Sequence, residues 1–391
     1  MPFAAAVSTD SDASLAVAEA ADRVAEGLPS PQLICAFVSP HHATAAGQIA
    51  SQLAARFPAA VLVGCGGESI VATGREIEND PAISLWAGSF GDGAHIDAFH
   101  LQPTDTPDGI SLLGWPDALD DCDPKRDLLL TFADPYTFPI TDLFFPRLRE
   151  DYPGLAVVGG MSSGADGPGQ AVLFHGGETV PFGAVGVLLR GVAGWRTVVS
   201  QGCRPIGRPL VVTKARENVI LEVGGQAPVR YLHDLFETLP ERDKELFQRG
   251  LHIGLVTNEY LESFDRGDFL IRNLYAIDRQ TGALVVTDRV RVGQTVQFQL
   301  RDATTADDDL RSLLRADRAK HPPAAGALLF TCNGRGTRLF PEPDHDAKAL
   351  AEELGPIPNA GFFAAGELGP VGGTNHIHGF TASSVLFSDG V

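Results

Sequence analysis

Three stretches of the sequence share one plan: an apolar run, a helical segment and a second apolar run that ends in glycines. The first copy covers residues 33–68, the second 128–164 and the third 328–367. The spacing between the first apolar run and the glycines is equal in the first two copies and two residues longer in the third. Because a strand, a crossover helix and a second strand typically pair in parallel, the plan predicts an α/β fold of repeated units.

Each copy is followed by a further apolar run, at residues 83–90, 184–189 and 380–387. A run of this length after a tight turn is typical of a strand that returns antiparallel. The predicted unit is therefore β-α-β-β, in which the segment between the glycines and the last strand is a loop.

Between the second and third copies the apolar residues again cluster at strand length, in residues 210–222, 251–257, 269–277 and 290–300. We expect these segments to form a mixed sheet. Helical patterns at 230–247 and 307–320 predict helices on its faces.

The chain has 391 residues, of which 44% are hydrophobic, and this length exceeds the size at which one core usually stops growing. We expect two closely packed domains with mixed sheets. The predicted bounds are an N-terminal helix in residues 1–29, a first domain in 30–225 and a second in 226–391, with the boundary near Gly225.

The 49 acidic and 30 basic side chains leave a net charge of −19. Such a surface repels phosphate backbones and anionic lipid headgroups, so we expect neither nucleic acid nor membranes as partners. The five cysteines are scattered singly, without a C-x-x-C pair. No signal peptide or apolar run of roughly 18 residues is recognisable, and we expect a cytoplasmic protein with reduced thiols.

The glycine turns follow strand ends, where ligands bind in open α/β sheets. Polar or reactive side chains recur there, namely Cys65 and Glu68 in the first copy and Cys332, Asn333, Arg335 and Glu367 in the third. Arg335 suits an anionic ligand because its guanidinium binds carboxylates through two parallel hydrogen bonds. Two alternatives stay open: each glycine run is a plain tight turn, or Arg335 pairs with a local carboxylate such as Glu367.

Two further arginines, Arg204 and Arg272, are candidates for the same cleft, which we expect between the two halves of the chain. Arg204 lies beside Cys203 in a stretch rich in glycine and proline, residues 200–207. The alternative interpretation of that stretch is a structured crossover between domains.

Five blocks of the sequence resemble the FIST family, predicted intracellular signal transduction proteins with a FIST N and a FIST C domain. The blocks are residues 64–68, 201–207, 269–273, 332–336 and 361–367. The resemblance implies that residues 30–225 form the FIST N domain and 226–391 the FIST C domain. It also implies a sensory domain for small ligands, with amino acids or their derivatives suggested for the family and haem in some members.

Gly66 departs from the small hydroxyl residue that relatives often carry after the cysteine. No output module is fused to the domain, so we expect the signal to pass to a separate protein. The resemblance does not imply catalysis.

Some patterns in the sequence are also compatible with an enzyme. Residues 160–164 spell G-x-S-x-G, but the glycines and proline that follow cannot continue as the helix that a hydrolase nucleophile requires. Cys332 beside Arg335 could be a reactive thiolate, and His376, His378 and Glu367 could bind a metal. Haem binding is a third possibility, for which no axial histidine can be assigned. We interpret the chain as a sensor for an amino-acid-like or other anionic small molecule.

Overall fold

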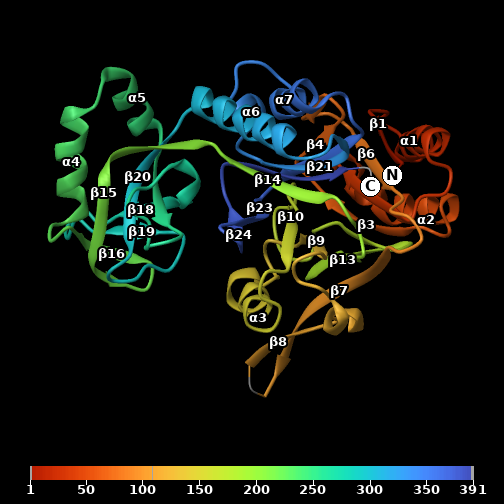
Figure 1. Cartoon of the computed structure of the whole chain (residues 1–391), viewed down its shortest axis with the longest axis horizontal. Helices are drawn as coiled ribbons and strands as arrows, with labels where there is room; N and C mark the ends of the chain where they lie inside the picture. The colour runs from red at the N-terminus through yellow and green to blue at the C-terminus, as the bar shows by residue number, and fades with distance from the viewer. Residues whose placement is uncertain (1, 108, 389–391) are drawn as a thin grey trace. The chain divides into compact units, whose positions relative to one another are not determined.

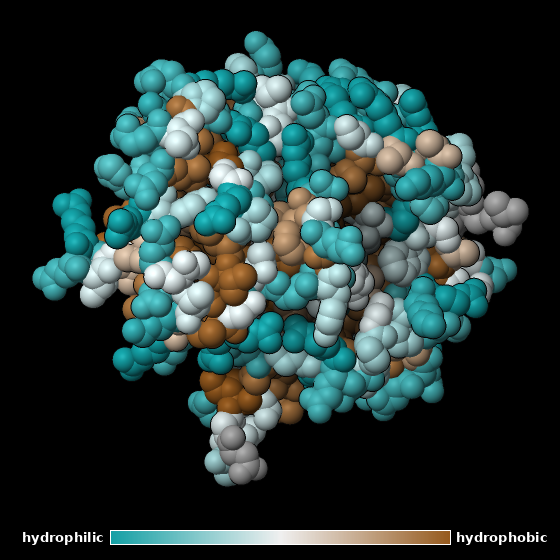
Figure 2. Space-filling view, turned by 60° about the vertical axis from the view of Figure 1, so that its left-hand side comes forward, coloured by the Kyte–Doolittle hydropathy of each residue, from teal (hydrophilic) through white to brown (hydrophobic). Residues whose placement is uncertain are grey.

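The computed structural model describes residues 2–107 and 109–388 and divides into two compact units. Within the described residues, the three-sheet unit comprises the chain up to Val199, Leu310–Ile377 and the segment from Thr381 onward. The barrel unit comprises Ser200–Asp309 and His378–Phe380. Among the described residues, no helix has the length and apolarity needed to span a membrane. Much of the face shown in Figure 2 is covered by hydrophilic residues, consistent with the net charge of −19.

The three repeated copies form three related sheets of the three-sheet unit (Figure 1). In each copy the first and second strands pair in parallel, and the return strand pairs antiparallel with the first. The first strands are β2 (Leu33–Val38), β9 (Leu128–Ala133) and β21 (Ala324–Cys332); the second are β3 (Val61–Gly66), β10 (Ala156–Met161) and β22 (Asn359–Ala364); the return strands are β6 (Ile83–Gly88), β13 (Ala184–Arg190) and β25 (Thr381–Ser388). The predicted α/β class with mixed sheets is confirmed.

Helices connect the two parallel strands of each copy, as the apolar periodicity predicts. They are α2 (Ala46–Arg56), α3 (Phe145–Asp151) and α7 (His345–Leu354). The N-terminal segment, for which the sequence predicts a helix, contains α1 (Ala13–Gly27) and also a strand, β1 (Phe3–Ser8), which pairs with β6. Helices α1 and α2 pack together beside this first sheet (Figure 1).

The segment predicted as a loop in each unit is a β-hairpin that joins the sheet of a different copy. The hairpins are β4 (Ser69–Ala72) with β5 (Arg75–Glu78), β11 (Leu173–His175) with β12 (Glu178–Val180), and β23 (Gly366–Val371) with β24 (Thr374–His378). Strand β4 of the first copy pairs with β22 of the third, β11 of the second with β3 of the first, and β23 of the third with β10 of the second. Each sheet is therefore completed by another copy, which ties the three copies into one core.

Outer strands extend the sheets further: β7 (His95–Thr106) and β8 (Gly109–Leu113) form a long hairpin at one edge of the second sheet, and β14 (Trp195–Gln201) lies at an edge of the third (Figure 1). Strands β1, β7 and β14 occupy equivalent places, since each lies beside the return strand of its sheet; among the described strands, only β8 extends one sheet beyond this shared order.

Phenylalanines from the first strands of all three copies meet in the core. The ring centroids of Phe37 and Phe132 lie 5.4 Å apart, those of Phe132 and Phe330 5.8 Å, and those of Phe37 and Phe330 6.2 Å. A glycine in each second strand lies close against the backbone of the first strand of the same copy. For example, a Cβ atom added to Gly361 would lie 1.7 Å from the carbonyl oxygen of Leu329, so no larger residue fits there.

The barrel unit contains a closed barrel of six strands. They are β15 (Cys203–Arg216), β16 (Val219–Val223), β17 (Leu251–Val256), β18 (Phe269–Ile277), β19 (Leu284–Val286) and β20 (Thr295–Arg301). All its ladders are antiparallel, so the prediction of a mixed sheet in this region is wrong. Strand β15 pairs with β16, β17 with β18 and β18 with β19, each with its successor along the chain. Strand β16 pairs with β19, and β20 closes the barrel by pairing with both β15 and β17.

Two helices replace the single helix predicted for residues 230–247. They are α4 (Pro228–Thr238) and α5 (Glu241–Arg249), separated by Leu239 and Pro240. Proline fixes its own φ and disfavours a helical residue before it, which explains the break. Gly225, the expected domain boundary, lies in the turn before α4, inside the barrel unit. Helix α6 (Ala303–Lys320) follows the last barrel strand.

Candidate functional site

The glycine-rich strand ends of the three copies meet in the three-sheet unit. The backbone N–H of Ser163 donates to the carbonyl of Gly66 at 3.1 Å, and that of Ala365 donates to the carbonyl of Met161 at 3.0 Å. The Ser163 hydroxyl bridges two other copies, because it donates to the carbonyl of Phe363 and accepts from the N–H of Glu68. We call this meeting point the strand-tip cluster; it also contains Cys332, Asn333 and Glu367.

Arg335 lies behind the strand-tip cluster and is fully buried. Its Nε and Nη2 donate to the two carboxylate oxygens of Asp346, at 2.7 and 2.8 Å, and its guanidinium carbon lies 5.2 Å from the centre of the Phe340 ring. Burial alone would lower the pKa of Arg335, but the charge and hydrogen bonds of Asp346 outweigh it and raise the pKa. Arg335 does pair with a local carboxylate, but the partner is Asp346 rather than Glu367.

Asp346 is held as an anion at the start of α7. Burial would raise the pKa of this carboxyl. The charge of Arg335 and the hydrogen bonds from Arg335 and His345 have the opposite effect and hold the pKa far below its usual value. The hydroxyl of Thr331 is also hydrogen-bonded to Asp346. The arrangement is a charge pair enclosed by the protein, so Arg335 offers no exposed surface to a ligand.

Glu367 is fully buried on β23 and carries an unsatisfied oxygen. Its Oε2 accepts from the N–H of Thr381 at 3.1 Å and from the Thr381 hydroxyl at 2.8 Å. Within the described part of the chain, Oε1 has no hydrogen-bond partner by the usual geometric limits. Burial raises the pKa of Glu367 to about 8. The hydrogen bonds from Thr381 and Cys332 and the charge of Arg335 lower this pKa, but burial has the larger effect. Cys332, Arg335 and Glu367 therefore form one interacting group. The sequence predicts that they share a pocket for a ligand; that role stays a prediction, because Arg335 and Glu367 are enclosed here.

Access to this group from solvent is narrow. Arg335 and Glu367 are fully enclosed, whereas Cys332 is 7% exposed and Asn333 is partly exposed. Beside them, the exposed guanidinium of Arg338 forms an ion pair with Glu68 and donates to the carbonyl of Asn333. Arg338 was not predicted from the sequence, although it follows the predicted Arg335 by three residues.

A second buried acid, Glu76, belongs to the same charge network and was also missed. Its Oε1 accepts from the backbone N–H groups of Asp346 and Ala347, at 2.9 and 3.0 Å, at the first turn of α7. Burial and the nearby charge of Asp346 raise the pKa of Glu76 to about 8. The bond spans 270 residues of sequence, so no local pattern could have revealed it.

The other predicted site residues occupy different surroundings. Cys65 is fully buried in the core and burial raises the pKa of its thiol, so it presents no surface to a ligand. Arg204 and Arg272 belong to the barrel unit. Arg204 is hydrogen-bonded to Asp243 and Asp302, and Nε of Arg272 donates to Asp288 at 2.7 Å.

The structure also tests the enzymatic alternatives. No group of three His, Cys, Asp or Glu side chains among the described residues is placed to hold a metal ion, so the proposed site of His376, His378 and Glu367 is not formed. No helix follows Ser162 directly, because residues 162–172 are irregular. A nucleophile elbow is therefore absent at that serine.

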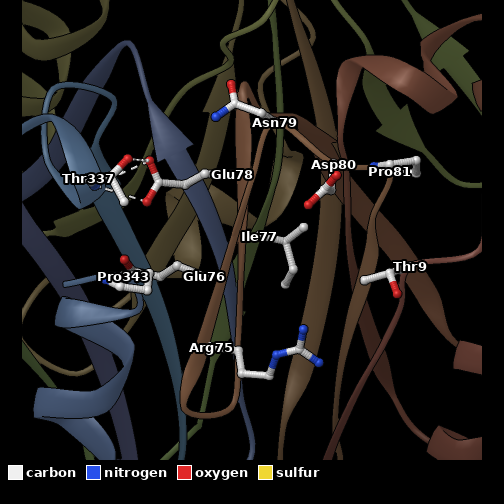
Figure 3. Close-up of a pocket in the computed structure, with 10 residues that line it drawn as sticks. All are labelled: Thr9, Arg75, Glu76, Ile77, Glu78, Asn79, Asp80, Pro81, Thr337 and Pro343. Atoms are coloured by element: carbon white, nitrogen blue, oxygen red, sulfur yellow. Dashed lines mark hydrogen bonds between the residues drawn. The ribbon is translucent and has the colours of Figure 1, made fainter.

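An open pocket of about 540 Å³ adjoins the charge network on another side of the three-sheet unit (Figure 3). Strand β5, the loop at residues 79–81, Thr9, Thr337 and Pro343 line it. Two smaller pockets, of about 430 and 130 Å³, lie elsewhere on the surface of this unit. No histidine lines any of these three pockets, so none of them offers a histidine ligand to haem iron.

Comparison with known proteins agrees with the resemblance seen in the sequence. The FIST N domain matches residues 32–226 and the FIST C domain residues 228–370. An uncharacterized protein of Mycobacterium tuberculosis H37Rv, Rv0628c, is 44% identical over 392 residues and 100% of both chains. An uncharacterized protein of Mycobacterium bovis, Mb0898c, is 43% identical over 100% of this chain and 99% of its own length. FIST domains are generally small-ligand-binding domains of signal transduction, and this chain belongs to the FIST family.

Proposed function

We propose that this FIST protein is a cytoplasmic sensor that binds an amino-acid-like or other anionic small molecule at the strand-tip cluster and signals to a separate protein. Family membership supports the general role. The proposed contacts are Cys332, Asn333 and Glu68, together with Arg338. Glu367 is enclosed in this structure, so in the proposal it contacts the ligand only after the segment 333–338 has moved. The enclosed Cys65 and Arg335 act only through their neighbours. Arg204 and Arg272 belong to the barrel unit, and for these two arginines a role in ligand binding stays a prediction from the sequence.

The observation that carries the proposal is the state of Glu367. A buried carboxyl with one oxygen lacking a partner is costly unless something else occupies that oxygen. Since burial raises the pKa of Glu367 to about 8, the group is largely protonated at neutral pH and can donate a hydrogen bond. A ligand carboxylate is a suitable acceptor, and the neighbouring Asn333 amide can add a second hydrogen bond.

Arg338 supplies the positive charge that Arg335 cannot offer. Its side chain is 56% exposed and its partner Glu68 is 32% exposed, and exposed ion pairs of this kind contribute only about 0–1 kcal/mol. An anionic ligand can therefore exchange with Glu68 at little cost. In the proposed mechanism the segment 333–338 moves as Arg338 turns to the ligand, and a partner protein binds the liganded conformation more tightly.

The proposal is tested by a thermal-shift screen of the full chain against amino acids, their N-acyl and keto derivatives, and small dicarboxylates. We expect at least one compound to raise the melting temperature of the wild type, and we expect Arg338→Met and Cys332→Ser to weaken that response. Arg216→Met is the matched control, because Arg216 is an exposed arginine of the barrel unit. A screen without any response, or a response that Arg338→Met leaves equal to the control, would reject the proposal.

A further inference from the structure

The open pocket of Figure 3 contains charged groups that no partner inside the protein satisfies. We call it the Arg75 pocket. Within residues 2–107 and 109–388, neither the Arg75 guanidinium nor the Asp80 carboxylate takes part in a hydrogen bond or an ion pair. Both side chains are exposed and line the pocket. Figure 3 shows them on either side of Ile77.

The other acids of the Arg75 pocket are already engaged. Glu78 accepts from the backbone N–H and the hydroxyl of Thr337, at 3.0 and 2.7 Å, and these bonds are drawn in Figure 3. Glu76 is buried and accepts from the first amides of α7. The exposed charged groups without a partner among the described residues are therefore one cation and one anion, with Ile77 between them. The buried Oε2 of Glu76 also lacks a hydrogen-bond partner there.

The charges around the pocket restrict what can enter. Among the described residues that line the pocket, Arg75 is the one base, against the acids Glu78 and Asp80. Glu76 also lines the pocket, but burial raises its pKa to about 8, so it adds little negative charge at neutral pH. A phosphate or a dicarboxylate would bring two negative charges to a site with a single cation and would be repelled by the carboxylates. A neutral apolar molecule would leave both charged side chains without new partners. A ligand with one carboxylate and one ammonium group satisfies both.

The volume indicates the size of that ligand. Pockets for small molecules typically measure about 300–1,000 Å³, and the Arg75 pocket falls inside this range at about 540 Å³. Arg75 and Thr9 also line a second pocket, of about 430 Å³, so the two pockets lie next to each other. Because the two hollows adjoin, an extended molecule can continue from one into the other while its carboxylate stays at Arg75.

We propose that the Arg75 pocket binds a small zwitterion of the size of a short peptide, with its carboxylate on Arg75 and its ammonium group on Asp80. The polar side chains of Thr9 and Asn79 add hydrogen-bonding groups at the rim. This site shares no residue with the strand-tip cluster, so it goes beyond the proposed function and stands or falls separately. Capture of peptide ends by fixed charges is a known form of peptide recognition.

The test is isothermal titration calorimetry of the full chain with trialanine in three forms: free at both ends, acetylated at the N-terminus, and amidated at the C-terminus. Acetylation removes the ammonium charge and amidation removes the carboxylate. Each blocked form should bind about tenfold more weakly than the free peptide, since a hydrogen-bonded charge contributes about one power of ten in affinity. Free alanine and dialanine, in parallel titrations, distinguish a single amino acid from a longer zwitterion.

Two variants assign the charges to residues. In Arg75→Met, free and amidated trialanine should bind equally, because the carboxylate has lost its partner, while acetylation should still weaken binding. In Asp80→Asn, free and acetylated trialanine should bind equally, because the ammonium group has lost its partner, while amidation should still weaken binding. Arg216→Met and Asp92→Asn are the controls, because each changes an exposed residue that does not line the Arg75 pocket.

Binding of free trialanine with this crossed pattern, and more tightly than free alanine, supports the proposal. The proposal is overturned if no free form binds at millimolar concentration, if blocking an end leaves the affinity unchanged, or if the two variants retain the wild-type pattern. The strand-tip variant Cys332→Ser should leave these affinities unchanged, because Cys332 does not line the Arg75 pocket, so a failure here is distinct from a failure of the proposed function.

Discussion

Replacement of Arg335 by methionine should destabilise the protein strongly without touching its surface. The substitution keeps much of the side-chain volume and leaves the Asp346 carboxylate buried without its counter-ion. Breaking a buried charge pair by removing one partner costs about 3–5 kcal/mol. Each kcal/mol lowers the melting temperature by about 2–4 °C in domains of 150–250 residues, so we expect a fall of roughly 10 °C. Urea denaturation followed by circular dichroism measures the free energy directly.

Two comparisons make this prediction specific. Arg338→Met breaks the exposed pair with Glu68 and should cost at most about 1 kcal/mol. The double variant Arg335→Met, Asp346→Leu removes both buried charges and should recover much of the loss. Since Arg335 holds the pKa of Asp346 far below its usual value, its stabilising effect is present at neutral pH and decreases in acid. The reasoning is refuted if Arg335→Met is no less stable than Arg338→Met at neutral pH.

Three further predictions follow from buried groups. Because burial raises the folded-state pKa of Glu76 to about 8, the folded protein holds a proton that the unfolded chain loses near its ordinary carboxyl pKa. The free energy of unfolding should therefore decrease between about pH 5 and pH 8, and less steeply in Glu76→Gln, as denaturation at several pH values can check. Iodoacetamide should alkylate Cys332, which is 7% exposed, well before the fully buried Cys65. Peptide mass spectrometry measures the two rates, and equal rates would contradict this prediction. Gly361→Ala should prevent stable folding because its Cβ meets a backbone oxygen at 1.7 Å, whereas Gly267→Ala has open space and should cost about 1 kcal/mol or less; thermal melting of both variants is the check.

The repeated units could be predicted because each one is local in sequence. Apolar runs, helical periodicity and glycines specify a strand, a helix and a second strand within about 35 residues, and parallel pairing follows from the crossover. The return strands were also recognisable from their length. The hairpins that join the sheet of a different copy could not be predicted. Val71 pairs with Gly361, which lies near the other end of the chain, and short strands such as β11 carry no distinctive pattern.

The candidate site was predicted in part. The convergence of Cys332, Arg335 and Glu367 follows from the meeting of strand ends, which a repeat implies. The burial of Arg335 could not be predicted in this way. Its partner Asp346 lies in the first turn of α7, and the position of that helix depends on a contact with Glu76, which is distant in sequence. The free state of Arg75 and Asp80 is equally invisible in the sequence, because absence of a partner is a property of the folded surface.

The ligand site at the strand tips is tested most directly by hydrogen exchange of the full chain, with and without the compound that raises its melting temperature most. Bound ligand should slow exchange of the amides in residues 332–338 and 366–368, and the Cys332→Ser variant should show less protection there. Protection confined to residues 75–81, or spread evenly over the chain, would contradict a ligand site at Cys332 and Glu367.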